Sequence, residues 1–229
     1  MDIASDTGAE WIALVRSSYN TCADAYSAQR SAEEKELELL SDDLREGSAI
    51  LDVGCGAGIP VSLRLSTRFR VTGVDISDRM IELARTNVPK GRFIRSSILE
   101  VDFAESSFDA IVSYYALFHI LRREQPKLFR QFYRWTKPGG LFLASYATGG
   151  HGVPGYTEDD FFGSRMYWSN YSFDRFRELT RMSGFQVLRV GVIGHGYQDQ
   201  NTEPEKAPYL FARSTKRIDT TQISSVADC

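Results

Sequence analysis

The period of the hydrophobic pattern changes repeatedly from about residue 48 onward. Short apolar runs at residues 48–54 (SAILDVG) and 70–75 (RVTGVD) alternate with segments of helical period such as residues 77–88 (SDRMIELARTNV). The run at residues 107–116 (SFDAIVSYYA) is apolar at most positions, which is typical of a strand buried on both faces. This alternation predicts a parallel sheet with helices on both faces.

Seven strands are expected in all, and the last two read as an antiparallel pair that closes the sheet. The other strands are expected at residues 91–97, 141–147, 185–194 and 207–215. Further helices are expected at residues 10–46, 58–69, 123–136 and 172–184. Ser77 is the expected N-cap of the helix that follows it, because its hydroxyl can accept from a free N–H of the first turn. The fold class is therefore α/β, doubly wound and mostly parallel.

The length favours one domain, residues 1–213, followed by a polar tail at residues 214–229. Its expected parts are an N-terminal helical cap, a core, and a closing helix with two strands, at residues 1–47, 48–147 and 172–213. Residues 148–171 (TGGHGVPGYTEDDFFGSRMYWSNY) lack both periods and are rich in glycine and aromatic residues. We expect them to form a long loop or lid that walls an apolar pocket.

The composition is that of an ordinary soluble globular protein, with 42% apolar and 25% charged residues. A net charge of -3 argues against a protein built mainly to bind nucleic acid or an anionic membrane. Three widely spaced cysteines form neither a disulfide framework nor a zinc site. The first ten residues are acidic where a secretory signal would be basic, and no apolar stretch is long enough to span a bilayer. We expect a cytoplasmic protein without a metal; the oligomeric state stays open.

Residues 51–58 (LDVGCGAG) place three glycines directly after the first apolar run. Such turns let the backbone approach a ligand closely, as in nucleotide sites. A dinucleotide turn would need a third glycine at position 59, which is Ile, and its pyrophosphate would be repelled by Asp52. A carboxylate at position 52 favours a ligand that carries positive charge. S-adenosylmethionine, with its ammonium and sulfonium groups and no phosphate, is such a ligand.

Four segments in this order resemble the motifs of class I S-adenosylmethionine-dependent methyltransferases. They are Asp52 to Gly58, VTGVD ending at Asp75, FDAIVSYYALFHI at residues 108–120, and TKPGGLFL at residues 136–143. The resemblance covers residues 48–147. It implies a Rossmann-like fold, S-adenosyl-L-methionine as cofactor, S-adenosyl-L-homocysteine as product, and transfer of a methyl group to a small-molecule acceptor.

The resemblance also implies which residues form the cofactor site. Asp52 would face the amino-acid part, and Asp75 would accept the two ribose hydroxyls. Ser97 stands where the family often has an acidic residue that binds the adenine amino group, so either its hydroxyl or the backbone of Ser97 and Ile98 would take that role. The full expected set is Tyr19, Tyr26, Asp52, Gly54, Gly56, Asp75, Ile76, Ser97, Ile98 and Tyr114.

Tyr19 and Tyr26 lie on one face of the expected N-terminal helix, which closes over the cofactor in the resembling family. Rings beside a sulfonium stabilise it by cation–π contact. On the acceptor side, the expected pocket residues are Tyr115, His151, Phe162, Tyr167 and Trp168. His119 follows the fourth strand, and two interpretations stay open: a loop-fixing hydrogen bond, or a general base for the acceptor.

Two alternatives to a small-molecule methyltransferase stay open. An RNA or protein methyltransferase fits the same core, but no basic stripe with interleaved aromatic residues accompanies it. A protein could also retain the cofactor fold as a non-methylating binding or rearrangement scaffold. A nicotinamide oxidoreductase is disfavoured by Ile59 and Asp52. We therefore predict a soluble methyltransferase with a small-molecule acceptor and neither a nucleic-acid nor a membrane partner.

Overall fold

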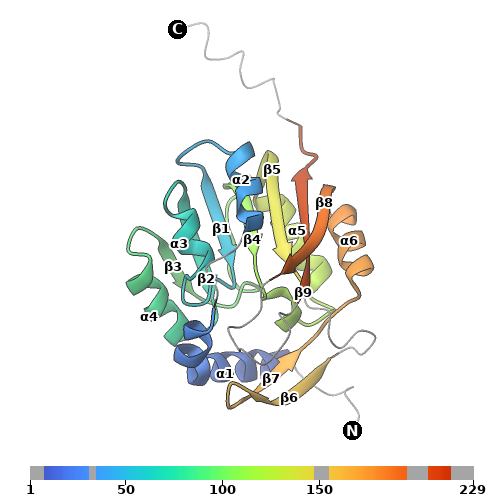
Figure 1. The fold of residues 1–229 in the computed structure, drawn as a ribbon. Helices are drawn as coiled ribbons and strands as arrows, with labels where there is room; N and C mark the ends of the chain where they lie inside the picture. Colours follow the sequence, from blue (N-terminus) through green and yellow to red (C-terminus); the bar gives the residue numbers. More distant parts are fainter. Residues whose placement is uncertain (1–7, 31–34, 147–154, 195–205, 218–229) are drawn as a thin grey trace, which may run out of the picture.

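A central sheet of seven strands, in the order β3-β2-β1-β4-β5-β9-β8, organises the computed structural model. The structure describes residues 8–30, 35–146, 155–194 and 206–217. Neighbouring strands from β3 to β5 are parallel, whereas β9 is antiparallel to both β5 and β8. The expected mostly parallel seven-stranded α/β fold with a closing antiparallel pair is confirmed (Figure 1).

The described elements follow the expected alternation closely. The strands of the sheet are β1 (Ala49–Val53), β2 (Arg70–Asp75), β3 (Arg92–Arg95), β4 (Phe108–Ser113), β5 (Thr136–Ser145), β8 (Phe185–Gly194) and β9 (Lys206–Ser214). The helices are α1 (Gly8–Ala28), α2 (Glu38–Asp43), α3 (Val61–Leu65), α4 (Asp78–Asn87), α5 (Gln125–Trp135) and α6 (Phe173–Met182). Two short 3₁₀ turns are η2 (Lys35–Leu37) and η3 (Leu117–His119).

Alternate side chains of the central strands enter two separate cores, one on each face of the sheet. Ile50 and Val112 pack with residues of α2 and α3, whereas Leu51 and Ile111 pack with residues of α5 and α6. All four side chains are completely buried. This burial on both faces explains why β1 and β4 read as continuous apolar runs rather than as alternating ones.

The start of α4 has the cap that its sequence predicts. The Ser77 hydroxyl accepts a hydrogen bond from the backbone N–H of Met80 at 3.1 Å. By contrast, the expected helix at residues 58–69 is reduced to the five residues of α3, with Pro60 at its N-cap.

The stretch expected to be helical, residues 10–46, is divided into separate elements. The helix α1 ends at Ala28, and a separate short segment, η2 followed by α2, begins at Lys35; residues 31–34 lie outside the described ranges. The two parts occupy different places in the fold. Leu40 of α2 packs into the core, whereas α1 lies across the carboxyl ends of the strands (Figure 1).

The expected loop at residues 148–171 contains a hairpin, which corrects the sequence-based prediction. The strands β6 (Tyr156–Phe161) and β7 (Ser164–Trp168) pair antiparallel through the two-residue turn Phe162-Gly163. Both turn residues have positive φ, 51° and 77°, as a type I′ hairpin turn requires. Asn-Gly is the usual sequence signal for this turn, so Phe-Gly left the hairpin undetected.

The hairpin packs against α1 and holds it over the edge of the sheet. Val15 and Cys22 of α1 form a buried cluster with Phe161, Met166 and Tyr167 of the hairpin. The rings of Trp11 and Tyr167 stack with their centroids 4.4 Å apart. The position of α1 therefore depends on a contact between segments far apart in the sequence.

We expect Tyr167→Ala to lower the free energy of unfolding by about 3 kcal/mol, because a nearly buried ring would leave a cavity beneath α1. Urea unfolding measures this change. Val192→Ala, at a side chain 58% exposed on β8, is the control and should change stability by less than about 0.5 kcal/mol. Equal stability of Tyr167→Ala and the native chain would show that the hairpin does not support α1.

Candidate functional site

A cavity of about 910 Å³, including the part that opens to solvent, lies between α1 and the carboxyl ends of β1, β2 and β4. Open α/β sheets bind their ligands at this edge, and the volume is within the range of small-molecule sites. Its wall is largely apolar. The residues from the expected set that line it are Tyr19, Tyr26, Gly54, Gly56, Asp75, Ile76, Ser97, Ile98, Tyr114, Tyr115 and His119.

Five residues of the expected set are not among the described lining residues, and one of them, Asp52, lines a smaller hollow beside this cavity. Phe162, Tyr167 and Trp168 do not line this cavity; they pack in the cluster between α1 and the hairpin. His151 lies outside the described residues. The described aromatic residues of the hairpin therefore support the cavity wall indirectly, through α1 and through His119, whose ring centroid lies 4.7 Å from that of Trp168.

Two features require glycine in the turn after β1: the close approach of another chain segment, and left-handed backbone angles. Gly54 has a φ of 70°, and a Cβ at this position would overlap with the Cβ of Ala116, directly after β4. Gly56 has a φ of 53°. Larger residues at position 54 would push apart the two strand ends that form the cavity wall.

Asp75, the last residue of β2, presents its carboxylate to the cavity and is fixed at both oxygens. Its Oδ2 accepts the backbone N–H of Gly56 at 2.9 Å, and its Oδ1 accepts the backbone N–H of Ser77 at 2.9 Å. Burial raises the pKa of Asp75, and these two bonds partly oppose that rise. A carboxylate has about four acceptor positions, so two ligand hydroxyls can also be accommodated.

A second, smaller hollow adjoins the cavity and shares Tyr26, Gly54, Gly56 and Tyr114 with it. Its wall holds the Asp52 carboxylate, which is 1% exposed. Asp52 Oδ2 accepts the Ser62 hydroxyl at 2.6 Å, so part of this carboxylate serves the structure.

Arg30 lies on the wall of the same hollow, and the sequence analysis missed it. Its guanidinium lies over the Tyr115 ring, 4.5 Å from the centroid, and 5.8 Å from that of Tyr26. The hollow thus has one carboxylate and one guanidinium. The sequence signal for Arg30 was weak, because it stands four residues after Tyr26 but beyond the end of α1 at Ala28.

His119 is held by a hydrogen bond at each ring nitrogen. Nδ1 lies 2.7 Å from the Tyr167 carbonyl oxygen, and because a carbonyl only accepts, Nδ1 carries the proton. Nε2 is then the acceptor for the Tyr19 hydroxyl at 2.8 Å. Burial lowers the pKa of His119 to about 4. This neutral imidazole connects η3, α1 and β7, which matches the loop-fixing interpretation.

Tyr115 adopts a backbone conformation that non-glycine residues rarely adopt, with a φ of 55°. Its N–H donates to the Ser145 hydroxyl at 2.9 Å, and both residues are buried. Such local strain persists only where the surroundings hold it, and it concentrates at functional sites. Here it directs the chain after β4 into the cavity wall.

The region that forms much of the cavity wall matches a known protein family. Residues 50–140 match the family model described as a methyltransferase domain. This stretch contains the glycine turn, Asp75 and the segments after β3 and β4 that line the cavity. Residues 50–140 belong to the class I S-adenosylmethionine-dependent methyltransferase family.

The methyltransferase core is also similar to that of a characterised relative. Phosphoethanolamine N-methyltransferase 1 of Triticum aestivum is 33% identical over 117 residues, which is 49% of this chain and 23% of the relative. The curated matches of this kind span between 21% and 52% of the relatives' own length. The likeness is thus one of the core, not of whole proteins.

Two solved structures share the fold along most of the chain. The 1,6-didemethyltoxoflavin-N1-methyltransferase of Burkholderia thailandensis, solved with 1,6-didemethyltoxoflavin and S-adenosylhomocysteine bound, has a TM-score of 0.69 and 21% identity, covering 94% of each chain. The [4+2]-cyclase SpnF has a TM-score of 0.57 and 20% identity, covering 79% of this chain and 80% of its own. At these identities the likeness establishes the fold alone.

Two candidate features are not found among the described residues. Within those ranges, no group of three or more His, Cys, Asp or Glu side chains is arranged to hold a metal ion. Across the same ranges, no helix is both long and apolar enough to cross a membrane.

We expect His119 of the methyltransferase core to make stability depend on pH below about 6.5. The unfolded imidazole binds a proton near pH 6.5 and the folded one only near pH 4, so acid favours unfolding by up to about 1.4 kcal/mol per pH unit. His119→Gln removes this dependence. Urea unfolding at pH 7, 6 and 5 should show the stability advantage of the native chain over the variant shrinking by about 2 kcal/mol. A constant advantage would contradict the buried neutral imidazole.

Proposed function

We propose that the chain is an S-adenosylmethionine-dependent methyltransferase that acts on a small-molecule acceptor, with S-adenosylhomocysteine as the second product. The observation that carries this proposal is the cavity at the edge of the methyltransferase core. It brings together the glycine turn, the fixed Asp75 carboxylate and the segment at residues 96–99. The sequence relatives support a small-molecule acceptor, because phosphoethanolamine, the acceptor named for the Triticum aestivum relative, is a small molecule.

The cavity has complementary groups for the separate parts of the cofactor. Asp75 would accept the ribose hydroxyls with its remaining acceptor positions. Ile76 and Ile98 would enclose the adenine, with Ser97 at its polar edge. Gly54 and Gly56 leave room for the chain that leads to the sulfur, beneath the rings of Tyr19 and Tyr26. A phosphate-containing dinucleotide would meet the Asp75 carboxylate there, and among the described residues no Lys or Arg lines the main cavity.

The smaller hollow matches the amino-acid end of the cofactor. Asp52 would pair with its ammonium group, and Arg30 would pair with its carboxylate. Both charges are needed, because a zwitterion transferred from water loses hydration at both ends. Placing one opposite charge near each end offsets that loss, and Tyr115 holds the guanidinium in place.

When bound, S-adenosylmethionine supplies a methyl group on a sulfonium, which a nucleophile displaces in line. The chain would contribute alignment and exclusion of water, and alignment alone can be worth ~7–11 kcal/mol. We assign His119 to hold Tyr19 and η3 in position, since both its nitrogens are engaged and its pKa is low. An acceptor that needs little deprotonation, such as a thiol or a neutral amine, suits this arrangement.

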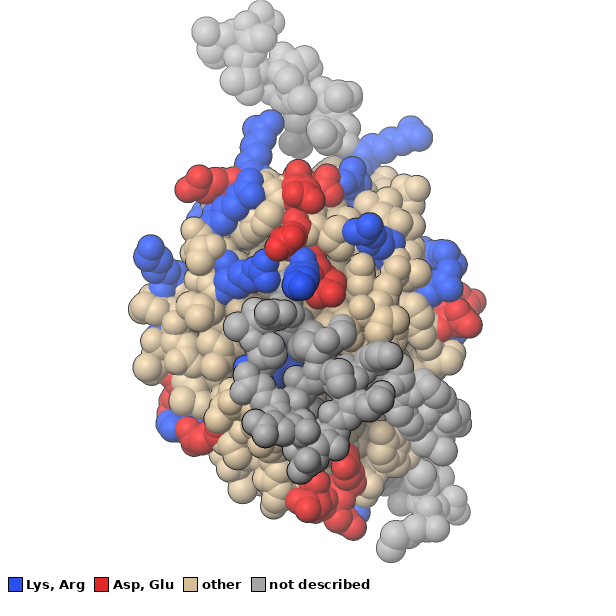
Figure 2. All heavy atoms as spheres, in the orientation of Figure 1, with Lys and Arg blue, Asp and Glu red and all other residues tan. Residues whose placement is uncertain are grey.

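The alternatives predict different surfaces and products. On the face shown in Figure 2, basic and acidic side chains are interspersed over the described residues, which does not favour a nucleic-acid acceptor. The fold shared with a [4+2]-cyclase keeps a non-methylating scaffold as the second candidate. We place the protein in the cytoplasm.

Binding and turnover together test the proposed function. Calorimetry should detect binding of S-adenosylmethionine and S-adenosylhomocysteine but not NAD. A screen of small thiols, amines, phenols and acids should then yield S-adenosylhomocysteine. Binding of NAD at equal or better affinity would contradict the proposed function, and tight cofactor binding without any methylated product would favour the scaffold.

We expect Arg30→Met to weaken S-adenosylhomocysteine binding about 10- to 100-fold, because a charged hydrogen bond to its carboxylate is lost. Binding of 5′-methylthioadenosine, which lacks the amino-acid part, should change less than about threefold. Calorimetry with both ligands provides the comparison.

The control is Arg189→Met, at an exposed arginine of β8 remote from the cavity, which should leave both affinities unchanged. Equal losses for the two ligands in Arg30→Met would mean that Arg30 shapes the site without binding the carboxylate.

A further inference from the structure

One face of α1 meets the first residues of α4 through three pairs of polar residues, which we call the α1–α4 junction. Arg16, Asn20 and Asp24 follow each other at one-turn intervals along α1 and therefore share a face. They contact the three consecutive residues at the start of α4. Those residues are Ser77, Asp78 and Arg79.

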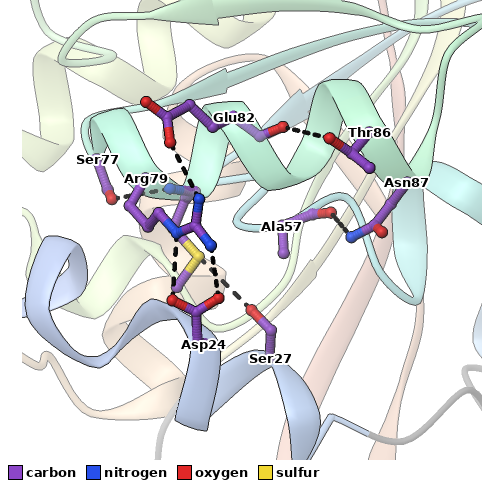
Figure 3. Close-up of polar contacts among 9 residues, drawn as sticks. Asp24, Ser27, Ala57, Ser77, Arg79, Glu82, Thr86 and Asn87 are labelled. Atoms are coloured by element: carbon purple, nitrogen blue, oxygen red, sulfur yellow. Dashed lines mark hydrogen bonds and ion pairs between the residues drawn. The ribbon is translucent and has the colours of Figure 1, made fainter.

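The two outer pairs of the junction are ion pairs of opposite orientation: α1 supplies the cation in one and the anion in the other. Arg16 pairs with Asp78 at 2.6 Å. Arg79 pairs with Asp24 at 2.8 Å and with Glu82 at 3.1 Å (Figure 3). Their side chains are between 42% and 70% exposed. Ion pairs this exposed contribute little to stability, but their order along both helices fixes which residues meet between them.

The central pair is different, because Asn20 reaches a buried residue. Asn20 Oδ1 accepts the Ser77 hydroxyl at 2.7 Å and the Arg79 backbone N–H at 3.2 Å. Ser77 is completely buried, and its oxygen also accepts the N–H of Met80. The Asn20 side chain thus fixes the direction of the Ser77 hydroxyl and satisfies a free N–H at the start of α4.

Ser77 also forms a hydrogen bond with Asp75, which lines the cavity. Its backbone N–H donates to Asp75 Oδ1, and the other oxygen of that carboxylate accepts from Gly56. A chain of three hydrogen bonds therefore runs from Asn20 through Ser77 and Asp75 to the glycine turn. Movement of Asn20 would release the residue that fixes one side of the Asp75 carboxylate.

An adjacent face of α1 forms part of the wall of the cavity. Trp11, Ile12, Val15, Tyr19 and Tyr26 all line it. A ligand at Asp75 would therefore lie between the sheet edge and the helix that carries Asn20. The same helix both covers the ligand and supports the residue that binds it.

We propose that Asn20 is a positioning residue: docking of α1 onto α4 through Asn20 sets Ser77 and, through it, the Asp75 carboxylate that receives the ribose. The cavity thus acquires its ribose-binding geometry only when the covering helix is docked. This inference rests on the proposed function, since Asp75 is assigned to the ribose there. An amide suits position 20 because it accepts two hydrogen bonds without adding a third negative charge beside Asp75 and Asp78.

The test compares S-adenosylhomocysteine with its 2′-deoxyribose analogue by calorimetry. Asn20→Ala should weaken binding of S-adenosylhomocysteine about tenfold and reduce the preference for it over the deoxy analogue at least threefold, because the carboxylate loses its fixed direction. Asn20→Asp, which keeps an acceptor oxygen for Ser77 and Arg79, should restore most of this preference. A residue that only anchored α1 would not change the preference.

Two variants separate the proposed role from loose docking of α1. Asp24→Asn weakens the same junction without touching Ser77, so it should lower both affinities equally and by less than about threefold. Gln186→Ala, at an exposed amide on β8, should change neither. An unchanged preference in folded Asn20→Ala would overturn the inference. Failure of the native chain to bind S-adenosylhomocysteine at all would instead overturn the proposed function.

Discussion

A carboxylate on the cavity wall, Asp75, is the constraint on which the rest of the site depends. Burial disfavours its charged form, so its oxygens must be met by fixed donors. Those donors are backbone N–H groups of Gly56 and Ser77, which come from two different turns. The left-handed backbone at Gly56 and the capped start of α4 therefore serve one purpose: they place two N–H groups around one acidic side chain.

The helix that covers this carboxylate is held from two sides by unlike interactions. On one side, rings of the hairpin pack against α1 and His119 connects it to η3 and β7. On the other, the α1–α4 junction is polar and largely exposed. Apolar burial is little affected by salt, whereas exposed ion pairs are screened. Added salt should therefore weaken the contacts of α1 with α4 more than its packing against the hairpin.

The part of the chain that matches known methyltransferases also forms much of the cavity wall. The matched region, residues 50–140, supplies the side of the cavity formed by the sheet edge. The segments outside it supply α1, the hairpin and the closing strands β8 and β9. In our proposal, one core binds the methyl donor, and the flanking segments determine how it is enclosed and what can approach it.

Local sequence patterns determined much of this protein. The hydrophobic periodicity predicted the sheet and its helices, and the glycine spacing with Asp52 and Asp75 predicted a candidate cofactor site. Ser77 was predicted as the N-cap of α4 from its residue type and position. Each of these signals acts within a few residues of the chain. Tertiary structure alone decided that Arg30 reaches the Asp52 hollow, that His119 is neutral with both nitrogens engaged, and that the hairpin lies behind α1. It also joined Asn20 to Ser77. These contacts link residues distant in the sequence, and their energies come from burial and hydrogen-bond geometry that no local pattern encodes.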